Sequence, residues 1–406
     1  MPAAAKAQCA GSEGYAAQFD GRRTFLWQPA MLAAAKARLE SDPALMAELR
    51  RRADAALAVG PFSVTDKTQA PPSGDRHDYR SLAPYWWPSA GKRNSEPYER
   101  RDGRINPERG GDAFDLARLQ AFSDTVRLLA LAHFHTGDPR YAERAAVLIR
   151  TWFVDPATRM TPNPSFAQGI PGRVAGRAEG IIDASRLVPV VEAIGLLDPS
   201  GTLTSTDREA LRDWFGALVR WMATSPNGRA ERAKTNNHGI YYDMLIAQFA
   251  LFAGLDEVAA AVTRLVGPRR IEAQFAPNGT LPEELKRTRS WHYTLWTLVA
   301  TARLAQMGRC VGVDIAAYRG AAGSTLPGAL DAAAAIVEPE RDWLHPDIAF
   351  GDPARMEEED RLAYETFASA AWYLENPAYA VAARRYIAAA QGGDDILYLG
   401  SPPVEG

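Results

Sequence analysis

The sequence has few cysteines, little net charge and no long apolar run. Among its 406 residues only Cys9 and Cys310 are cysteines, which allows either one disulfide or two free thiols. Because Cys9 lies in a segment expected to be flexible, neither cysteine indicates a compartment. No run of about 18 apolar residues occurs, so no transmembrane helix is expected. A formal net charge of −3 argues against a nucleic-acid partner, and an anionic substrate would need a local positive patch.

The sequence also lacks the common catalytic signatures. It contains no HExxH, no Cys–His zinc spacing, no Walker loop, no GxSxG and no Rossmann GxGxxG. The stretches "GDRHD" and "HPDIAFGD" carry metal-ligating residue types, but their spacing matches no ligand pattern, so no metal site is predicted. The first residues, "MPAAAKAQCAGSEGY", have no apolar core of signal-peptide type. This start fits either a cytoplasmic protein or a chain from which a signal has been removed.

Helical periodicity runs through most of the chain. Leu119, Phe122, Val126 and Leu129 recur at the spacing of one helical face. A second amphipathic stretch follows directly, with Asp138 as a suitable cap, and the pair reads as an antiparallel helical hairpin. The same pattern predicts helices near residues 29–58, 114–136, 139–153, 178–196, 205–224, 237–254, 256–266, 283–307, 325–338, 358–375 and 377–391.

These helices define the expected fold class. Strand-like alternation is scarce, and no fixed-period repeat of solenoid type is present. Helices in short-linked pairs predict an all-α fold, an (α/α) toroid built from helical hairpins, with an irregular helical bundle as the alternative. We expect a flexible N-terminal segment over residues 1–20, a single domain over 21–395 and a C-terminal tail over 396–406.

Two long polar stretches interrupt the helices, at residues 61–111 and 155–176. Loops of this length in a compact domain are usually functional or disordered, and the aromatic run Tyr85, Trp86 and Trp87 argues against disorder. In a helical toroid such loops would line the mouth of a central cleft. The tryptophan rings offer flat faces of the kind that stack on sugars.

The first polar stretch also carries cations and hydrogen-bonding groups. Lys67, Arg76 and Arg80 supply positive charge, and His77 and Tyr79 supply hydrogen bonds. An ordered structural loop would explain these residues equally well.

The second polar stretch places amides and arginines beside glycines. It contains Asn163, Gln168, Arg173 and Arg177. These residue types suit recognition of hydroxyl and carboxylate groups, although the pattern is weak by itself.

The string "KTNNHGIYYD" has two interpretations. In the first, Asn236 or Asn237 caps the helix that follows, and His238 is a hydrogen-bonded first-turn or core histidine. In the second, the first helical turn carries Asn237 and His238 into an active site. Tyr242 lies one turn beyond His238 and would face the substrate, whereas Tyr241 would only pack.

A second polar cluster, "GTLPEELKRTRSWHYTLW", strengthens the active-site interpretation. An exposed, charged first helical turn would explain its acidic residues. On a continuous helix, however, Arg289 and Lys286 would share a face with Tyr293. A nearby cation lowers the pKa of a tyrosine by favouring the phenolate, which makes tyrosine a usable general base.

Four stretches together resemble a known family. "SVTDKTQAPPSGDRHDY", "NPSFAQGIPGR", "TNNHGIYYD" and "ELKRTRSWHY" are similar to motifs of the alginate lyase superfamily of polysaccharide lyases, and they occur in the family's order. The resemblance is closest to the branch that cleaves β-1,4-linked uronans, either alginate or polyglucuronate. It implies an incomplete (α/α) toroid with a long cleft, in agreement with the helical pattern.

The resemblance also implies site residues. An Asn–His pair falls on Asn237 and His238, and the catalytic tyrosine falls on Tyr293. The "ELKR" motif places the catalytic arginine at Arg287, whereas helical geometry favours Arg289. Substrate contacts are then expected from a lysine that matches the family pattern and from the other polar and aromatic candidates: Lys67, His77, Trp86, Trp87, Asn163, Gln168, Tyr242 and Arg289.

The implied chemistry is β-elimination. A base removes the C5 proton of a uronic acid, the bond to O4 breaks, and a 4,5-unsaturated sugar remains. Asn237 and an arginine would neutralise the carboxyl group, and Tyr293 as phenolate would take the proton. In β-D-mannuronate and β-D-glucuronate the C5 hydrogen and O4 share one face, so elimination is syn and Tyr293 would serve as both base and acid. With His238 as base, an anti route for α-L-guluronate remains open.

The expected partner is an anionic polysaccharide, with neither nucleic acid nor membrane involved and with no metal or organic cofactor required. A toroid glycoside hydrolase acting on uronate oligosaccharides and a non-catalytic uronan-binding protein are the rival hypotheses. A polymer-degrading activity favours a periplasmic or secreted location over a cytoplasmic one. The sequence predicts neither the oligomeric state nor a preference between mannuronate and glucuronate.

Overall fold

The structure is a computed structural model that describes residues 8–390, 393 and 395–399. It is mostly helical, with 62% helix and 4% strand. The chain divides into two compact units, one formed by residues 1–48 and 234–406 (unit 1) and the other by residues 49–233 (unit 2). Within the described residues, every helix is too short or too polar to cross a lipid bilayer.

Unit 2 is built around a helical hairpin. Helices α3 (Leu116–Thr136) and α4 (Pro139–Phe153) pack against each other across a Gly-Asp link, as the periodicity predicts. Gly137 ends α3 in the left-handed region at φ 71°, and the Asp138 side chain caps α4 by accepting from the amide of Arg140 at 3.0 Å. Phe122 stacks on Trp152 with a centroid distance of 4.8 Å, so aromatic rings fill the space between the helices.

The other helices of unit 2 continue this core. They are α2 (Pro43–Ala56, which begins in unit 1), η6 (Ala178–Leu187), α5 (Val188–Leu197), η7 (Asp198–Ser200), α6 (Ser205–Thr224) and α7 (Pro226–Arg232).

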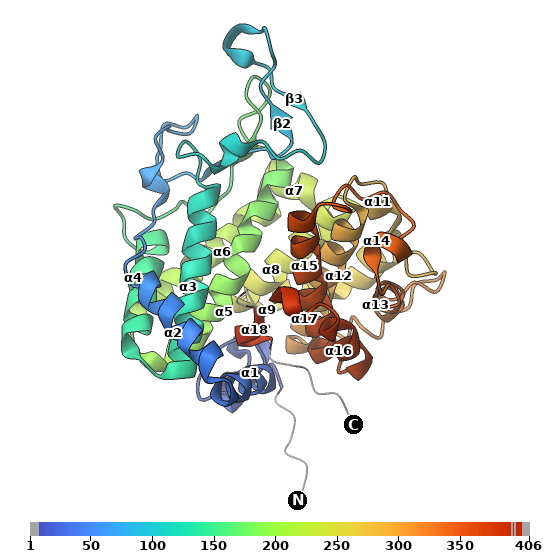
Figure 1. Ribbon diagram of the computed structural model, residues 1–406. Helices are drawn as coiled ribbons and strands as arrows, with labels where there is room; N and C mark the ends of the chain where they lie inside the picture. Colours follow the sequence, from blue (N-terminus) through green and yellow to red (C-terminus); the bar gives the residue numbers. More distant parts are fainter. Residues whose placement is uncertain (1–7, 391–392, 394, 400–406) are drawn as a thin grey trace, which may run out of the picture. The chain divides into compact units, whose positions relative to one another are not determined.

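The two long polar stretches are folded in unit 2. Strand β1 (Arg80–Leu82) pairs in parallel with β4 (Phe166–Gly169), which joins the two stretches to each other. Strands β2 (Trp86–Trp87) and β3 (Glu99–Arg100) form an antiparallel ribbon, seen at the top of Figure 1. Short 3-10 turns complete the region: η3 (Val64–Asp66), η4 (Arg93–Ser95) and η5 (Pro107–Gly110).

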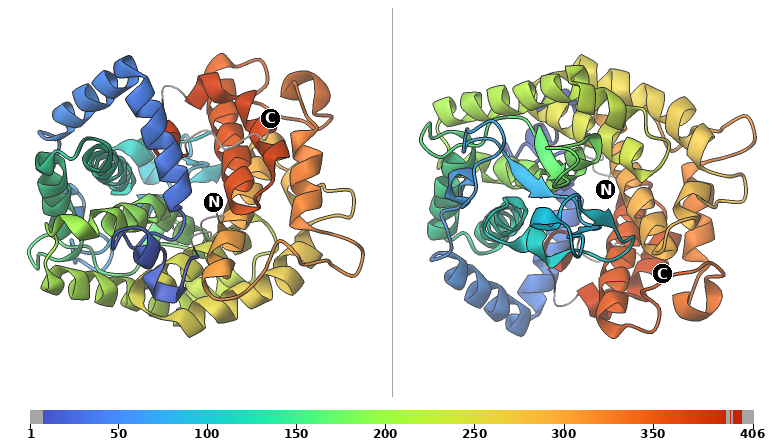
Figure 2. Two further views of the ribbon diagram at one scale, coloured as in Figure 1. Left: turned by 90° about the horizontal axis from the view of Figure 1, so that it is seen from below. Right: turned by 90° about the horizontal axis from the view of Figure 1, so that it is seen from above.

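Unit 1 is organised around α12 (Ser290–Cys310). This helix packs against α8 (Asn237–Ala253) and against α15 (Pro353–Tyr373) (Figure 1, Figure 2). From Gly239 to Phe252 every residue of α8 is buried, because its sequence is apolar on nearly all faces.

Shorter elements surround these three helices. They are α1 (Pro29–Ser41), α9 (Asp256–Val266), η8 (Gly267–Ile271), α10 (Glu272–Gln274), α11 (Pro282–Leu285), α13 (Leu326–Ala334), α14 (Pro339–Asp342), α16 (Pro377–Arg384), α17 (Ile387–Ala390) and α18 (Asp395–Tyr398).

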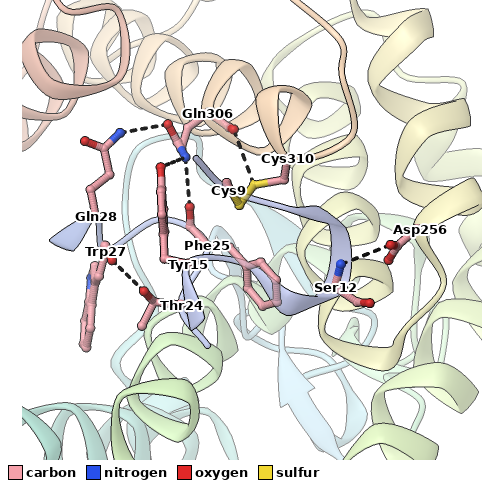
Figure 3. The surroundings of a disulfide bond; sticks show 10 residues. All are labelled: Cys9, Ser12, Tyr15, Thr24, Phe25, Trp27, Gln28, Asp256, Gln306 and Cys310. Atoms are coloured by element: carbon pink, nitrogen blue, oxygen red, sulfur yellow. Dashed lines mark hydrogen bonds between the residues drawn. A yellow bond between two sulfur atoms is a disulfide. The ribbon is translucent and has the colours of Figure 1, made fainter. Parts of the chain in front are cut away.

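The N-terminal segment is folded from residue 8 onward, contrary to the flexible segment predicted over residues 1–20. Two 3-10 turns, η1 (Gly11–Glu13) and η2 (Ala16–Gln18), follow a disulfide between Cys9 and Cys310. Tyr15 accepts a hydrogen bond from Gln306 Nε2 at 2.7 Å (Figure 3). The disulfide closes a loop over a sequence separation of 301 residues and replaces the alternative of two free thiols. Residues 1–7 lie outside the described residues.

The predicted C-terminal tail also differs from the structure where it is described. Ile396, Leu397, Tyr398 and Leu399 are buried, and the Tyr398 ring stacks on Trp27 at 5.2 Å. These apolar side chains gain stability by packing instead of remaining in water. Residues 400–406 of the predicted tail lie outside the described part of the chain.

Two of the predicted helices are each divided into two helices in the structure. The stretch 29–58 is divided into α1 and α2 at Asp42–Pro43, where proline cannot continue the preceding helix. The stretch 283–307 is divided more sharply, because α11 ends at Leu285 and α12 begins at Ser290. The residues between them are therefore not on one helical face.

Candidate active site

The start of α8 is shaped by tight backbone packing. Asn236 occupies the N-cap position, but its side chain makes no capping bond. Arg270 crosses this turn and bonds to the Lys234 carbonyl at 2.7 Å and to Asp243 at 2.7 and 3.1 Å. A Cβ atom on Gly239 would lie only 2.4 Å from Arg270 Nη1. The glycine of "TNNHGIYYD" is therefore required for this packing, and Asp243 holds Arg270.

Asn237 is joined to Glu284 by a two-point contact. The Asn237 backbone amide donates to Glu284 Oε1 at 2.7 Å, and its Nδ2 donates to Oε2 at 2.7 Å. The two residues are only 1% and 2% exposed. Burial raises the pKa of Glu284, and the two bonds from Asn237 and the charges of Arg287 and His238 oppose that rise. The role of Asn237 at a substrate carboxyl group stays a prediction; in this structure its amide is buried and donates to Glu284.

Arg287 and Tyr293 form the predicted arginine–tyrosine pair. Arg287 Nη2 donates to the Tyr293 hydroxyl at 2.8 Å, and Cζ lies 3.8 Å from the ring centroid. Both side chains are half-buried, as is His238 at the start of α8. A cation in contact with a phenol favours its deprotonated form, so this pair can supply a general base.

Arg289 does not take that place. It is the N-cap of α12: its carbonyl accepts from the Tyr293 amide at 3.0 Å, but its own backbone, with φ −123° and ψ 64°, is not helical. Its guanidinium bonds to Glu359 at 2.6 and 3.1 Å and to Glu358 at 2.9 Å. Although burial works against the charge, the two carboxylates raise the pKa of Arg289. Both carboxylates hold the Arg289 guanidinium, so its substrate contact stays a prediction that this geometry does not favour.

Glu359 also faces the residue next to Tyr293. His292 Nδ1 lies 3.5 Å from Glu359 Oε2, and the His292 ring stacks on Trp296 at 5.3 Å. Glu359 itself is fully buried. Sequence reasoning missed this residue because "MEEED" resembles an exposed acidic turn. Its spacing to Leu362 and Ala363 on the buried face of α15 was the signal that could have found it.

The tyrosines of α8 pack inside unit 1. Tyr241 and Tyr242 are each 3% exposed, and Tyr241 stacks on Trp296 at 5.0 Å. The prediction that Tyr242 faces the substrate is therefore corrected. Nearly all faces of α8 are buried, so a position one turn beyond His238 does not reach solvent.

Lys67 is a buried structural cation in unit 2. Its side chain is 0% exposed and pairs with Asp115 Oδ2 at 3.1 Å. Its Nζ also donates to the carbonyls of Val64 and Arg76. Burial lowers the pKa of Lys67 against the opposing effect of Asp115, and burial raises the pKa of Asp115 to about 6. The predicted substrate-binding role is corrected, because the ammonium group is enclosed by protein acceptors.

Gln168 belongs to a second buried network of unit 2. Its Nε2 donates to Asp183 Oδ1 at 3.2 Å, and its Oε1 accepts from Arg177 Nη2 at 2.8 Å. Asp183 also accepts from Ser81 and from the Tyr79 hydroxyl at 3.1 Å. The network holds Gln168 at φ 48° and only 4% exposed. Gln168 therefore organises the β1–β4 pair and does not present its amide to a ligand.

The remaining candidates of unit 2 lie nearer the surface. His77 and Asn163 are half-buried; His77 Nδ1 lies 2.7 Å from the Arg159 carbonyl, and Asn163 Oδ1 accepts from the Ser165 amide at 3.2 Å. Both therefore already contact backbone groups of unit 2.

The two tryptophans each have an arginine over the ring. Arg173 lies 5.1 Å from the Trp86 ring centroid, and Arg101 lies 5.3 Å from that of Trp87. Stacking on a sugar would therefore use the other ring face or require the arginine to move.

Unit 2 contains a cavity of ≈ 740 Å³ beside these residues. Its lining includes Arg80, Tyr98, Phe114 and Arg173. Arg80 lies 5.1 Å from the Phe114 ring centroid. Guanidinium groups beside aromatic rings suit an acidic sugar, which presents both a carboxylate and an apolar ring face.

Comparison with known proteins identifies the family. The family model described as alginate lyase matches residues 63–343. The chain belongs to the alginate lyase family. A crystal structure of an alginate lyase from Bacteroides ovatus is 31% identical with a TM-score of 0.85, covering 93% of this chain and 99% of that chain.

More distant alginate lyase structures are also similar. Alginate lyase A1-III from Sphingomonas species A1 is 14% identical with a TM-score of 0.46, covering 80% of this chain and 86% of that chain. No curated protein sequence matches the chain.

Membership of the alginate lyase family confirms the fold class and the resemblance. The chain has the all-α fold of the α/α toroid type and is a polysaccharide lyase for alginate-type, anionic polymers. Within the described residues, no three His, Cys, Asp or Glu side chains are grouped as a metal ion would require.

Proposed function

We propose that this alginate lyase family member cleaves β-1,4-linked uronic acid polymers, the polymannuronate of alginate or polyglucuronate, by syn β-elimination. The observation that carries the proposal is the contact between Arg287 and Tyr293, 2.8 Å from guanidinium nitrogen to phenol oxygen. This pair is half-buried, whereas the other predicted cations, Lys67 and Arg289, are held by carboxylates.

The proposed reaction uses one residue for both proton transfers. Tyr293 as phenolate takes the C5 proton, the electron pair of the C–H bond forms the C4–C5 double bond, and O4 leaves with the electrons of the C4–O4 bond. Tyr293 then returns the proton to O4. Arg287 stabilises the phenolate, and His238 lies at the start of the neighbouring helix as a second titratable group. For α-L-guluronate, an anti route would use His238 as base and Tyr293 as acid.

Substrate binding is proposed for the accessible groups of unit 2. The arginines and aromatic rings around the ≈ 740 Å³ cavity provide charge and flat surface for a uronate. Trp86, Trp87, His77 and Asn163 stay as predicted contacts. Lys67, Gln168, Tyr242 and Arg289 are assigned instead to the framework, because each is buried or bound by protein groups.

A periplasmic or secreted location is proposed on the disulfide. Cys9 and Cys310 are joined, and disulfides form and persist in oxidising compartments. The chain would then meet its polymer outside the cytoplasm.

The test is the nature of the product. Incubation with polymannuronate, polyglucuronate and polyguluronate should generate the ultraviolet absorbance of a conjugated unsaturated uronate on at least one polymer. New reducing ends without that absorbance would indicate a hydrolase, and binding without either would indicate a non-catalytic uronan-binding protein. Either outcome would overturn the proposal, and the ranking of the polymers resolves the substrate.

A further inference from the structure

Glu284 is a buried residue that contacts Asn237, the neighbour of half-buried His238 in the candidate site. It is 2% exposed, yet it carries a carboxylate rather than an apolar side chain. Burial of an anion is costly unless it is paired and hydrogen-bonded. The two donors of Asn237, each at 2.7 Å, provide that compensation.

The same carboxylate is coupled to the site by chain geometry and charge. Glu284 is in α11, and its carbonyl accepts from the Arg287 amide at 3.0 Å, so one turn links the two residues. Arg287 and His238 both act electrostatically on the Glu284 carboxyl group, against the burial that raises its pKa. One buried carboxylate thus connects the first turn of α8 with the arginine that bonds to Tyr293.

We propose that Glu284 is a positioning residue for the elimination, a fixed buried anion that holds Asn237 and sets the electrostatic balance at Arg287, His238 and Tyr293. Glu284 does not touch the substrate in this role. It acts through the residues that do, and the inference therefore rests on the lyase activity proposed above.

Other charged groups around Tyr293 are compensated separately. Arg289 and His292 face Glu359, and Arg270 faces Asp243. Removing the Glu284 charge would take away a buried anion that interacts electrostatically with Arg287. The local potential would become more positive, which favours phenolate on Tyr293. The loss of activity at low pH should therefore move toward lower pH.

The first experiment compares Glu284→Gln with Glu283→Gln. Glu283 is the matched control, because it is the adjacent carboxylate, pairs with Lys286 at 2.6 Å and is 46% exposed. Unsaturated product is measured against pH on the polymer that the wild-type chain prefers. Glu284→Gln is expected to lower kcat about tenfold to a hundredfold and to move the acid limb down by about 1 pH unit. Glu283→Gln should match the wild-type profile.

A pair of double variants separates charge from hydrogen bonding and covers the case in which Glu284→Gln does not fold. In Asn237→Asp with Glu284→Gln, the glutamine accepts from the backbone amide of residue 237 and donates to the aspartate, so a buried anion remains. In Asn237→Ser with Glu284→Gln, the same glutamine donates to a hydroxyl, and no anion remains. The acid limb should lie at lower pH in the serine pair than in the aspartate pair.

The outcomes distinguish this inference from the proposed function. Equal acid limbs in the two double variants, or an unmoved limb in a folded Glu284→Gln chain, would overturn the positioning role while leaving lyase activity intact. Absence of unsaturated product from the wild-type chain would overturn the proposed function and the catalytic role of Glu284 together.

Discussion

The polar cluster at the starts of α8 and α12 differs from the polar networks of unit 2 in the burial of its outermost side chains. In unit 1, buried Asn237 and Glu284 lead outward to Arg287 and Tyr293, which remain half-buried. In unit 2, Lys67 is enclosed with Asp115, and both side chains are 0% exposed. Charged residues of similar type therefore serve different purposes. Exposure of the outermost side chain, rather than the presence of a charge in a motif, distinguishes a candidate catalytic residue from a structural one.

A large loss of activity is expected from substitution of Arg287. Arg287→Ala removes the guanidinium that contacts the Tyr293 hydroxyl, so kcat should fall by about a hundredfold or more while thermal stability stays close to that of the wild type. Steady-state kinetics and a melting curve of the same preparation check this. Near-normal turnover in a folded variant would remove Arg287 from the reaction.

Substitution of Lys67 should lower the stability of the chain rather than act directly on the reaction. Lys67→Met leaves Asp115 as a buried carboxylate without its ion-pair partner at 3.1 Å. The free energy of unfolding should fall by about 3 kcal/mol, because removing one partner of a buried pair is costly even though Arg118 stays 3.4 Å from Asp115. Urea denaturation measures this. A stable variant with a raised KM would restore the substrate-binding role that the motif suggested.

Removal of the disulfide should affect stability without affecting chemistry. The double variant Cys9→Ser, Cys310→Ser opens a loop closed over 301 residues and should lower the free energy of unfolding by about 2–4 kcal/mol. Because Gln306 still bonds to Tyr15, kcat at low temperature should be retained. A specific loss of kcat with unchanged stability would contradict this assignment.

The smallest effect is expected at the cavity of unit 2. Arg173→Ala removes one cation from its lining and should raise KM for polymer about threefold to tenfold with kcat unchanged. Arg212→Ala is the control, since Arg212 is an exposed arginine of the same unit outside this lining. Equal KM values for the two variants would exclude the cavity from substrate binding.

Helical periodicity predicted the helices, and the family resemblance supplied Tyr293 with either Arg287 or Arg289. Neither predicted the residues that surround them. The apolar spacing of Leu119, Phe122 and Val126 predicts α3 because one helical face is buried. Arg287 was reached through the "ELKR" motif, whereas the helical argument for Arg289 failed because the chain leaves the helix between Leu285 and Ser290.

The partners of these residues depend on tertiary contacts. Glu284 meets Asn237 across 47 positions, and Glu359 meets Arg289 across 70 positions. A single sequence gives no register between α8, α11 and α15, so these pairings could not be derived from spacing. Lys67 was predicted at a substrate surface because the sequence does not show its tertiary contact with Asp115, where both side chains are buried.

The catalytic role of the Tyr293 hydroxyl is tested by Tyr293→Phe. The substitution removes one hydroxyl and leaves the ring in place, so polymer binding and thermal stability should be preserved. Formation of unsaturated uronate should fall at least about a thousandfold, because both proton transfers depend on that oxygen. A folded Tyr293→Phe chain that still generates unsaturated product at a rate near that of the wild type would contradict the account.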